Sequence, residues 1–117
     1  MNEKSSPVPK LDRLVHEPAR LAILSTLSEV EQVDFNFLLL ALGLSRGNLS
    51  SHMTKLAEAG YVVIDKRFVG NLPNTTYAIT EEGSSALALY WEQLEALRTV
   101  ARRAPELPTS PAAEPAR

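Results

Sequence analysis

The stretch that decides the fold runs over residues 34–80: DFNFLLLALGLSRGNLSSHMTKLAEAGYVVIDKRFVGNLPNTTYAIT. It begins with an apolar segment, residues 35–42, which predicts a short helix. Asp34 is a favourable N-cap for that helix, and Gly43 readily takes the left-handed conformation in which helices end. A second helix follows almost at once, because Ser45 is again a good N-cap. We therefore expect two helices joined by a tight turn.

The second helix is predicted to extend to Ala59 and is followed by a β-hairpin. The residues from Tyr61 to Phe68 are rich in β-branched and aromatic side chains, as are those from Thr75 to Thr80. Between these two runs lie turn-forming residues, so we expect a loop of roughly six residues at the tip. Val33 is a candidate for a brief strand that pairs with this hairpin.

The helix over 45–59 has two different faces. Leu49, Met53 and Leu56 recur at helical spacing and predict a buried face. The other side carries small polar and basic groups, several of which weaken helices, whereas an ordinary solvated face favours Glu, Lys and Gln. Small hydroxyl and amide groups approach phosphates and base edges closely. We favour a nucleic-acid-binding face over a merely solvated one.

Two helices joined by a short turn, with the second one exposed, form a helix-turn-helix, and the hairpin makes it a winged variant. On this interpretation the helix enters the major groove of double-stranded DNA, and two cations of the hairpin contact phosphates. For these two cations, simple exposure to solvent is an equally good explanation. The predicted DNA-binding residues are Ser45, Arg46, Asn48, Ser50, Ser51, Thr54, Lys55, Lys66 and Arg67.

The charge distribution agrees modestly with this assignment. The whole chain of 117 residues has a net charge of −2, which is unusual for a nucleic-acid binder. Within residues 44–79, however, four basic side chains stand against two acidic ones, whereas the segments on either side are net negative. The only positive third of the chain is therefore the one that contains the predicted DNA-binding helix.

Composition excludes several classes of function. The chain has no cysteine and only two histidines, which disfavours disulfides, thiolate chemistry and metal sensing. We see no phosphate-binding loop and no nucleophile–base constellation, so we expect neither an enzyme nor a cofactor. No apolar run is long enough to span a membrane, and the first residues lack the apolar segment of a secretory signal. We expect a cytoplasmic protein with no membrane contact.

The size fits one domain, which we place at residues 11–103 between two tails. Residues 1–10 and the proline-rich residues 104–117 are too poor in apolar side chains to order themselves, so both tails are predicted to be disordered. The first helix of the domain is expected to begin at Pro18, and a short helical stretch around Leu14 is expected to precede it.

The last helix, about residues 81–103, is expected to mediate dimerisation. It begins at the N-cap Thr80 and carries an apolar seam with heptad spacing, together with further apolar side chains outside the seam. One helix of so small a domain has difficulty burying two stripes in its own core. The alternative is a single-chain core helix. The predicted dimerisation residues are Leu87, Tyr90, Trp91, Leu94, Leu97 and Ala101.

Three segments together resemble winged-helix transcriptional regulators of the MarR and ArsR type: HEPARLAILSTL (16–27), LLLALGLSRGNLSSHMTKLAEAGYV (38–62) and TTYAITEEG (75–83). The chain looks most like the small single-domain group among them. The resemblance implies a mainly α fold with a small β-hairpin wing (α+β) and a C-terminal dimerisation helix. It also implies a homodimer that binds a pseudo-palindromic operator through the helix at 45–59. Our leading hypothesis is that this dimer acts as a repressor of transcription.

The resemblance places His52 near DNA as well, although we favour a structural role for it at the junction of helix and wing. Wings in this group usually carry arginine at the tip, whereas this tip reads GNLPN. An alternative function therefore stays open, a winged-helix protein–protein interaction module that does not bind DNA. A small-molecule effector is a further possibility without support; four aromatic side chains are candidates to line its cavity, Phe35, Phe37, Tyr90 and Trp91.

Overall fold

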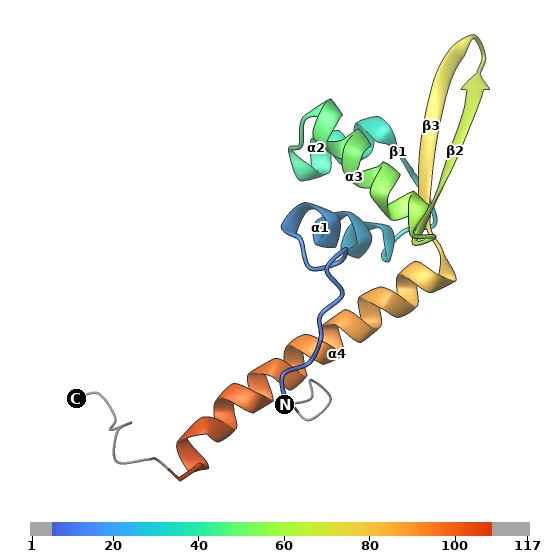
Figure 1. Ribbon diagram of the computed structural model, residues 1–117. Helices are drawn as coiled ribbons and strands as arrows, with labels where there is room; N and C mark the ends of the chain where they lie inside the picture. Colours follow the sequence, from blue (N-terminus) through green and yellow to red (C-terminus); the bar gives the residue numbers. More distant parts are fainter. Residues whose placement is uncertain (1–5, 109–117) are drawn as a thin grey trace.

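The computed structural model describes residues 6–108 and shows a helical domain with a protruding β-hairpin and a long C-terminal helix (Figure 1). The predicted fold class is confirmed. In chain order the elements are α1 Pro18–Leu27, β1 Val33–Asp34, α2 Phe35–Leu42, α3 Arg46–Glu58, β2 Val62–Val69, β3 Leu72–Ile79, α4 Glu81–Arg103 and the 3-10 turn η2 Ala104–Glu106.

Side-chain caps fix where the helices begin. The Asp34 carboxylate accepts a hydrogen bond from the backbone N–H of Phe37 at 2.8 Å, and the Ser45 hydroxyl accepts one from Asn48 at 3.1 Å. Each bond satisfies an N–H group that the helix itself leaves without a partner. Gly43 ends α2 with a φ of 66°, as expected from its conformational freedom. The turn between α2 and α3 is therefore dictated locally.

The sheet has three antiparallel strands in the order β1-β3-β2. The predicted strand at Val33 is confirmed, because Val33 lies opposite Tyr77 of β3. β1 covers β3 only at its base, so the outer parts of β2 and β3 form a two-stranded ribbon that extends away from the helices (Figure 1).

The predicted six-residue loop at the tip of the hairpin is wrong. The strands continue to Val69 and Leu72, which lie opposite each other, and leave a two-residue turn. Gly70 has a φ of 65°, which suits the first central position of a tight hairpin turn. Pro73 is tolerated in β3 because it lies opposite Phe68 in a pair whose N–H groups point away from each other, so no ladder hydrogen bond is lost.

The stretch before α1 also differs from expectation, because it forms a turn around Asp12 rather than a helix. One carboxylate oxygen of Asp12 accepts the N–H of Leu14 at 2.9 Å, and the other accepts the Tyr61 hydroxyl at 2.6 Å. This bond, with burial and the negative charge beside it, raises the pKa of Tyr61 to about 12. Asp12 thus ties the N-terminal segment to the start of the wing.

The tails are described only in part. Residues 6–10 have no regular secondary structure, and residues 104–106 continue α4 as a 3-10 turn instead of beginning the tail. Residues 1–5 and 109–117 of the predicted tails lie outside the described residues.

The core lies between α1, α3, the base of the sheet and the first half of α4. The predicted apolar face of α3 is confirmed, because Leu49 and Leu56 are fully buried and Met53 is 1% exposed. The remaining buried side chains come from every other major element: Val15, Ile23, Leu24, Leu27, Leu38, Val62, Tyr77, Leu87 and Tyr90.

A close backbone contact fixes the start of α4. The Thr80 hydroxyl donates to the carbonyl of Gly60 at 2.6 Å and accepts from the N–H of Gly83 at 3.0 Å. Gly83 packs so tightly that a Cβ there would overlap the Tyr61 carbonyl oxygen and lie 2.9 Å from Ile79. The glycine therefore allows the start of α4 to pack closely against the turn between α3 and β2.

Candidate nucleic-acid interface

The polar face of α3 is open to solvent. All seven predicted residues from Ser45 to Lys55 are exposed, and so are Lys66 and Arg67 on the wing. Because the apolar face of the same helix is locked into the core, the polar face has a fixed direction. A ligand therefore meets preoriented donors on this face; their contact with DNA stays a prediction.

Arg46 is positioned by an aromatic ring. Its guanidinium carbon lies 5.2 Å from the centroid of Phe35, a cation–π arrangement that limits the freedom of the long side chain. Phe35 is itself held by a tilted ring contact with Tyr77, with centroids 6.3 Å apart. Burial raises the pKa of Tyr77 above the ordinary value for a tyrosine. The sequence analysis did not foresee this support, because nothing in the spacing of Phe35 and Arg46 indicates it.

A groove separates α3 from the wing. It has a volume of about 460 Å³, and its lining includes Arg46 and Ser50 from the helix and Lys66 and Thr75 from the hairpin. Helix and hairpin thus present cations on both sides of one depression. That arrangement suits a phosphate backbone, which would run between the two elements when α3 occupies the adjacent groove.

The two wing cations differ in their freedom. Arg67 forms an ion pair with Asp65 on the same strand, so part of its charge is already compensated. Successive residues of a strand point to opposite faces. Lys66, which lines the groove beside α3, and Arg67 therefore lie on different sides of the ribbon. Lys66 is therefore the better placed of the two for a phosphate that also contacts α3.

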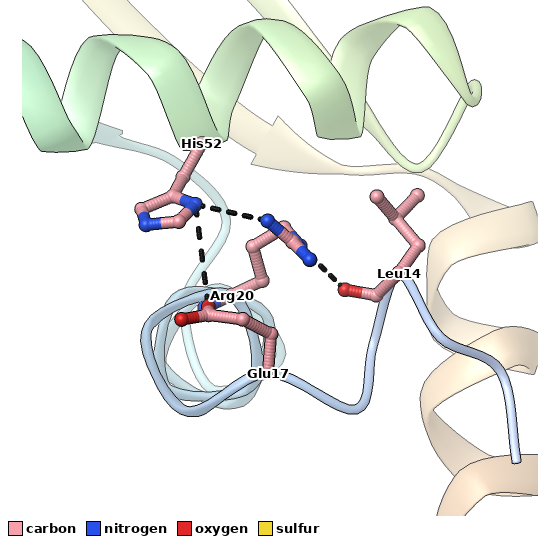
Figure 2. A network of polar contacts seen from close by, with 4 residues as sticks. All are labelled: Leu14, Glu17, Arg20 and His52. Atoms are coloured by element: carbon pink, nitrogen blue, oxygen red, sulfur yellow. Dashed lines mark hydrogen bonds and ion pairs between the residues drawn. The ribbon is translucent and has the colours of Figure 1, made fainter.

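Thr54 and His52 are less available than their neighbours. The Thr54 hydroxyl donates to the carbonyl of Ser50 at 2.9 Å, within the helix. His52 is half-buried and points from α3 toward α1, where its Nδ1 accepts a hydrogen bond from Arg20 at 3.1 Å (Figure 2). A structural position was expected for His52, but at the wing; the structure places it against α1.

Arg20 is the centre of this contact between the helices. Its Nε donates to the carbonyl of Leu14 at 2.6 Å, so one guanidinium joins the N-terminal segment, α1 and α3 (Figure 2). The Glu17 carboxylate lies 4.0 Å from His52 and also caps α1 by accepting the N–H of Arg20. Because a guanidinium can only donate, Nδ1 of His52 is the acceptor in the hydrogen bond from Arg20. The network fixes the orientation of α3.

The predicted dimerisation residues divide into two groups along α4. Leu87 and Tyr90 are 6% and 3% exposed and belong to the core of the single chain. Little of either side chain is left for a partner, and their part in a subunit interface stays a prediction. Their own domain already covers them. The same seam continues along the outer half of α4, where Leu94 is half-buried and Leu97 and Ala101 are exposed, and Trp91 lies beside it with 47% exposure.

The four aromatic side chains proposed for an effector cavity do not form one lining. Phe35 pairs with Tyr77 at the base of the wing, whereas Tyr90 pairs with Trp91 on α4 in an edge-on contact with centroids 5.5 Å apart. Phe37 is 48% exposed. The contacts therefore favour packing over a shared ligand site.

Comparison with known proteins agrees with this geometry. Residues 19–98 match the family model described as the winged helix DNA-binding domain, which spans most of the chain. The chain belongs to this winged helix family. Membership places it among DNA-binding domains rather than among enzymes, as the sequence predicted.

Individual relatives extend the picture. The winged helix chain is 33% identical over 78 residues to the uncharacterized protein MJ0432 of Methanocaldococcus jannaschii. The aligned segment covers 67% of this chain and 85% of the relative. A transcriptional regulator homologue from Pyrococcus horikoshii superposes with a TM-score of 0.70 at 27% identity, over 77% of this chain and 89% of the other. A MarR-family structure from Enterococcus faecalis shares the fold with a TM-score of 0.64 at 19% identity, over 81% and 86% of the two chains.

Over the described residues, no helix of this winged helix protein combines the length and the apolar character that a membrane crossing requires.

Proposed function

We propose that the chain is a dimeric, sequence-specific DNA-binding regulator of transcription that acts as a repressor. The observation that carries the proposal is the open polar face of α3, held rigidly by its buried apolar face and by the contact between Arg20 and His52. The solved structure from Pyrococcus horikoshii, a transcriptional regulator homologue, supports the assignment to regulation. Repression is the simplest mode, because a domain bound across a promoter excludes the polymerase from it.

Within this proposal α3 enters the major groove. Arg46 at the start of the helix carries the bidentate donors that suit the O6 and N7 atoms of guanine, and Asn48 carries an amide that suits adenine. Ser50, Ser51 and Lys55 are short or flexible enough to contact the flanking phosphates. Lys66 would add a phosphate contact across the groove that it shares with Arg46.

A homodimer through the outer half of α4 completes the proposal. There α4 extends beyond the other helices (Figure 1), and the apolar seam continues along it, with Leu97 exposed. A matching helix of a second copy would cover Trp91, Leu94 and Leu97. Two-fold symmetry would then present two copies of α3 to half-sites about 34 Å apart on one side of the duplex.

A binding titration tests DNA binding itself. Fluorescence polarisation at low salt, with duplex from the chain's own promoter region, should show saturable binding that weakens as salt is added. Each neutralised phosphate contributes about 0.9 to the slope of log affinity against log salt, and the uncharged tip predicts a shallow slope. Failure to bind any duplex would favour the interaction module instead.

The substitution Leu97→Glu tests the dimer. It places a carboxylate near its own two-fold mate, next to the existing acidic residues of α4, so we expect a monomer by light scattering and at least about tenfold weaker operator binding. Leu40→Glu is the matched control, because Leu40 is 88% exposed on α2 and lies outside the proposed interface. A Leu97→Glu protein that remains a dimer would contradict the assignment of α4.

A further inference from the structure

The end of the wing exposes an unusual concentration of apolar side chains. Phe68, Val69 and Leu72 are 72%, 60% and 73% exposed, and Pro73 is exposed beside them. We call these four residues the apolar tip. Contiguous apolar surface of this kind marks a binding site more often than chance, because water disfavours it.

The register of the hairpin makes the apolar tip two-sided. Phe68 lies opposite Pro73, and Val69 lies opposite Leu72. Directly opposite residues of a ladder share a face, and neighbouring residues of a strand point to different faces. One pair therefore covers each face of a thin ribbon, which is the shape of a wedge rather than of a flat docking surface.

The surroundings of the apolar tip favour DNA as its occupant. Phe68 and Pro73 lie on the same face as Lys66 and Thr75, which line the groove beside Arg46. The apolar tip thus continues the surface on which we propose that a phosphate backbone lies. No acidic residue occurs from position 66 to position 80, so nothing on this part of the hairpin repels phosphates.

Two amide side chains beside the apolar tip can donate hydrogen bonds. Asn71 lies in the turn and Asn74 lies opposite Arg67, so both flank the apolar tip. The minor groove presents acceptors at every base pair, to which amides can donate. Proteins that combine such amides with apolar wedges insert the wedge between base steps and kink the duplex.

We propose that the apolar tip is a minor-groove wedge, which inserts Phe68 or Leu72 at a base step beside the major groove occupied by α3 and bends the DNA. The inference rests on the proposed function, because the wedge reaches the minor groove only if α3 docks on the duplex. Flexible pyrimidine–purine steps should be preferred at the insertion point, since they unstack most easily. A wing of this kind adds affinity without adding phosphate contacts.

The test compares two sets of exposed residues on the same hairpin. The double variant F68T/L72T removes one apolar side chain from each face of the tip, and threonine preserves β propensity. The control is Val63→Thr, because Val63 is 54% exposed at the base of the same hairpin, opposite Ala78. The probe is duplex DNA from the chain's own promoter region, labelled at both ends for energy transfer and titrated with the full chain.

The wild-type chain and Val63→Thr should bind and bring the duplex ends closer together. F68T/L72T should bind about tenfold more weakly, leave the duplex straight and keep the wild-type salt slope, because no charge is lost. Wild-type protein that binds straight DNA, or a double variant with unchanged affinity and bend, would overturn the wedge and leave the apolar tip for a protein partner. Wild-type protein that binds no duplex would remove the proposed function and the wedge with it, so the two failures are distinguishable.

Discussion

Replacing Arg46 and Ser50 with alanine should lower affinity for the cognate duplex by about 100-fold, because the proposed bidentate base contact of Arg46 contributes roughly 1–3 kcal/mol of discrimination and the proposed phosphate contact of Ser50 is lost with it. Both side chains are exposed and line the groove beside the wing. Neither contributes to the core, so the melting temperature should change little. The small expected loss is the stacking of Arg46 on Phe35. Polarisation titration measures the affinity, and circular dichroism reports the fold.

The matched control is R13A/S84A, which removes the same two side-chain types from exposed positions outside α3 and the wing. Net charge changes equally in both double variants, so a difference between them reflects position rather than overall electrostatics. If both double variants keep the affinity of the wild type, α3 does not read the duplex. Equal loss in both would point to a diffuse electrostatic attraction.

Replacing Gly83 with alanine should destabilise the fold by about 3 kcal/mol or more, because the new methyl group meets backbone rather than a flexible side chain. The start of α4 would have to move away from the Tyr61 carbonyl. That shift would strain the hydrogen bonds of Thr80 to Gly60 and Gly83, which hold α4 against the turn after α3. Denaturant unfolding monitored by circular dichroism measures the change in the free energy of unfolding.

Gly47→Ala is the control for the glycine argument. Gly47 lies in the first turn of α3, and an added Cβ there would meet nothing within 4 Å. Alanine should therefore leave stability unchanged or raise it by up to about 1 kcal/mol, as its helix propensity predicts. If both glycine variants unfold at the same denaturant concentration as the wild type, the close approach of α4 to Tyr61 is not a real constraint.

The parts of the fold that follow from short-range signals were predictable from the sequence. Asp34, Ser45 and Thr80 each accept a hydrogen bond from the backbone N–H three residues later. The starts of three helices are therefore determined by residues close together in the sequence. The two faces of α3 follow equally from helical spacing, because its buried residues recur at that period.

The parts that depend on contacts between distant residues were not predictable in this way. Gly83 is an ordinary helix residue in the sequence, and only the position of the Tyr61 carbonyl makes it necessary. The contact between Arg20 and His52 joins residues 32 positions apart, and no local pattern announces it. Heptad spacing predicts the apolar seam of α4. It does not predict which part of the seam the domain itself buries and which part stays exposed, because this depends on how far the other elements extend along α4.

In the wing, the turn-forming residues were recognised from the sequence, but the length of the turn was predicted wrongly. Gly70, Asn71, Pro73 and Asn74 are all turn formers, which predicted a loop. Only the first two form the turn, because the strands pair up to Val69 and Leu72. The longer ribbon carries the apolar side chains outward. The tip that lacks a charged residue therefore becomes a candidate contact surface.

Selection of bound sequences from random duplex DNA tests the central claim most directly, because it reports specificity and half-site geometry together. A dimer joined through α4 that reads DNA with two copies of α3 should enrich two inverted half-sites whose centres lie about 34 Å apart, one turn of the duplex. Enrichment of a single unpaired site would contradict the dimer. No enrichment at all would contradict sequence-specific reading by α3.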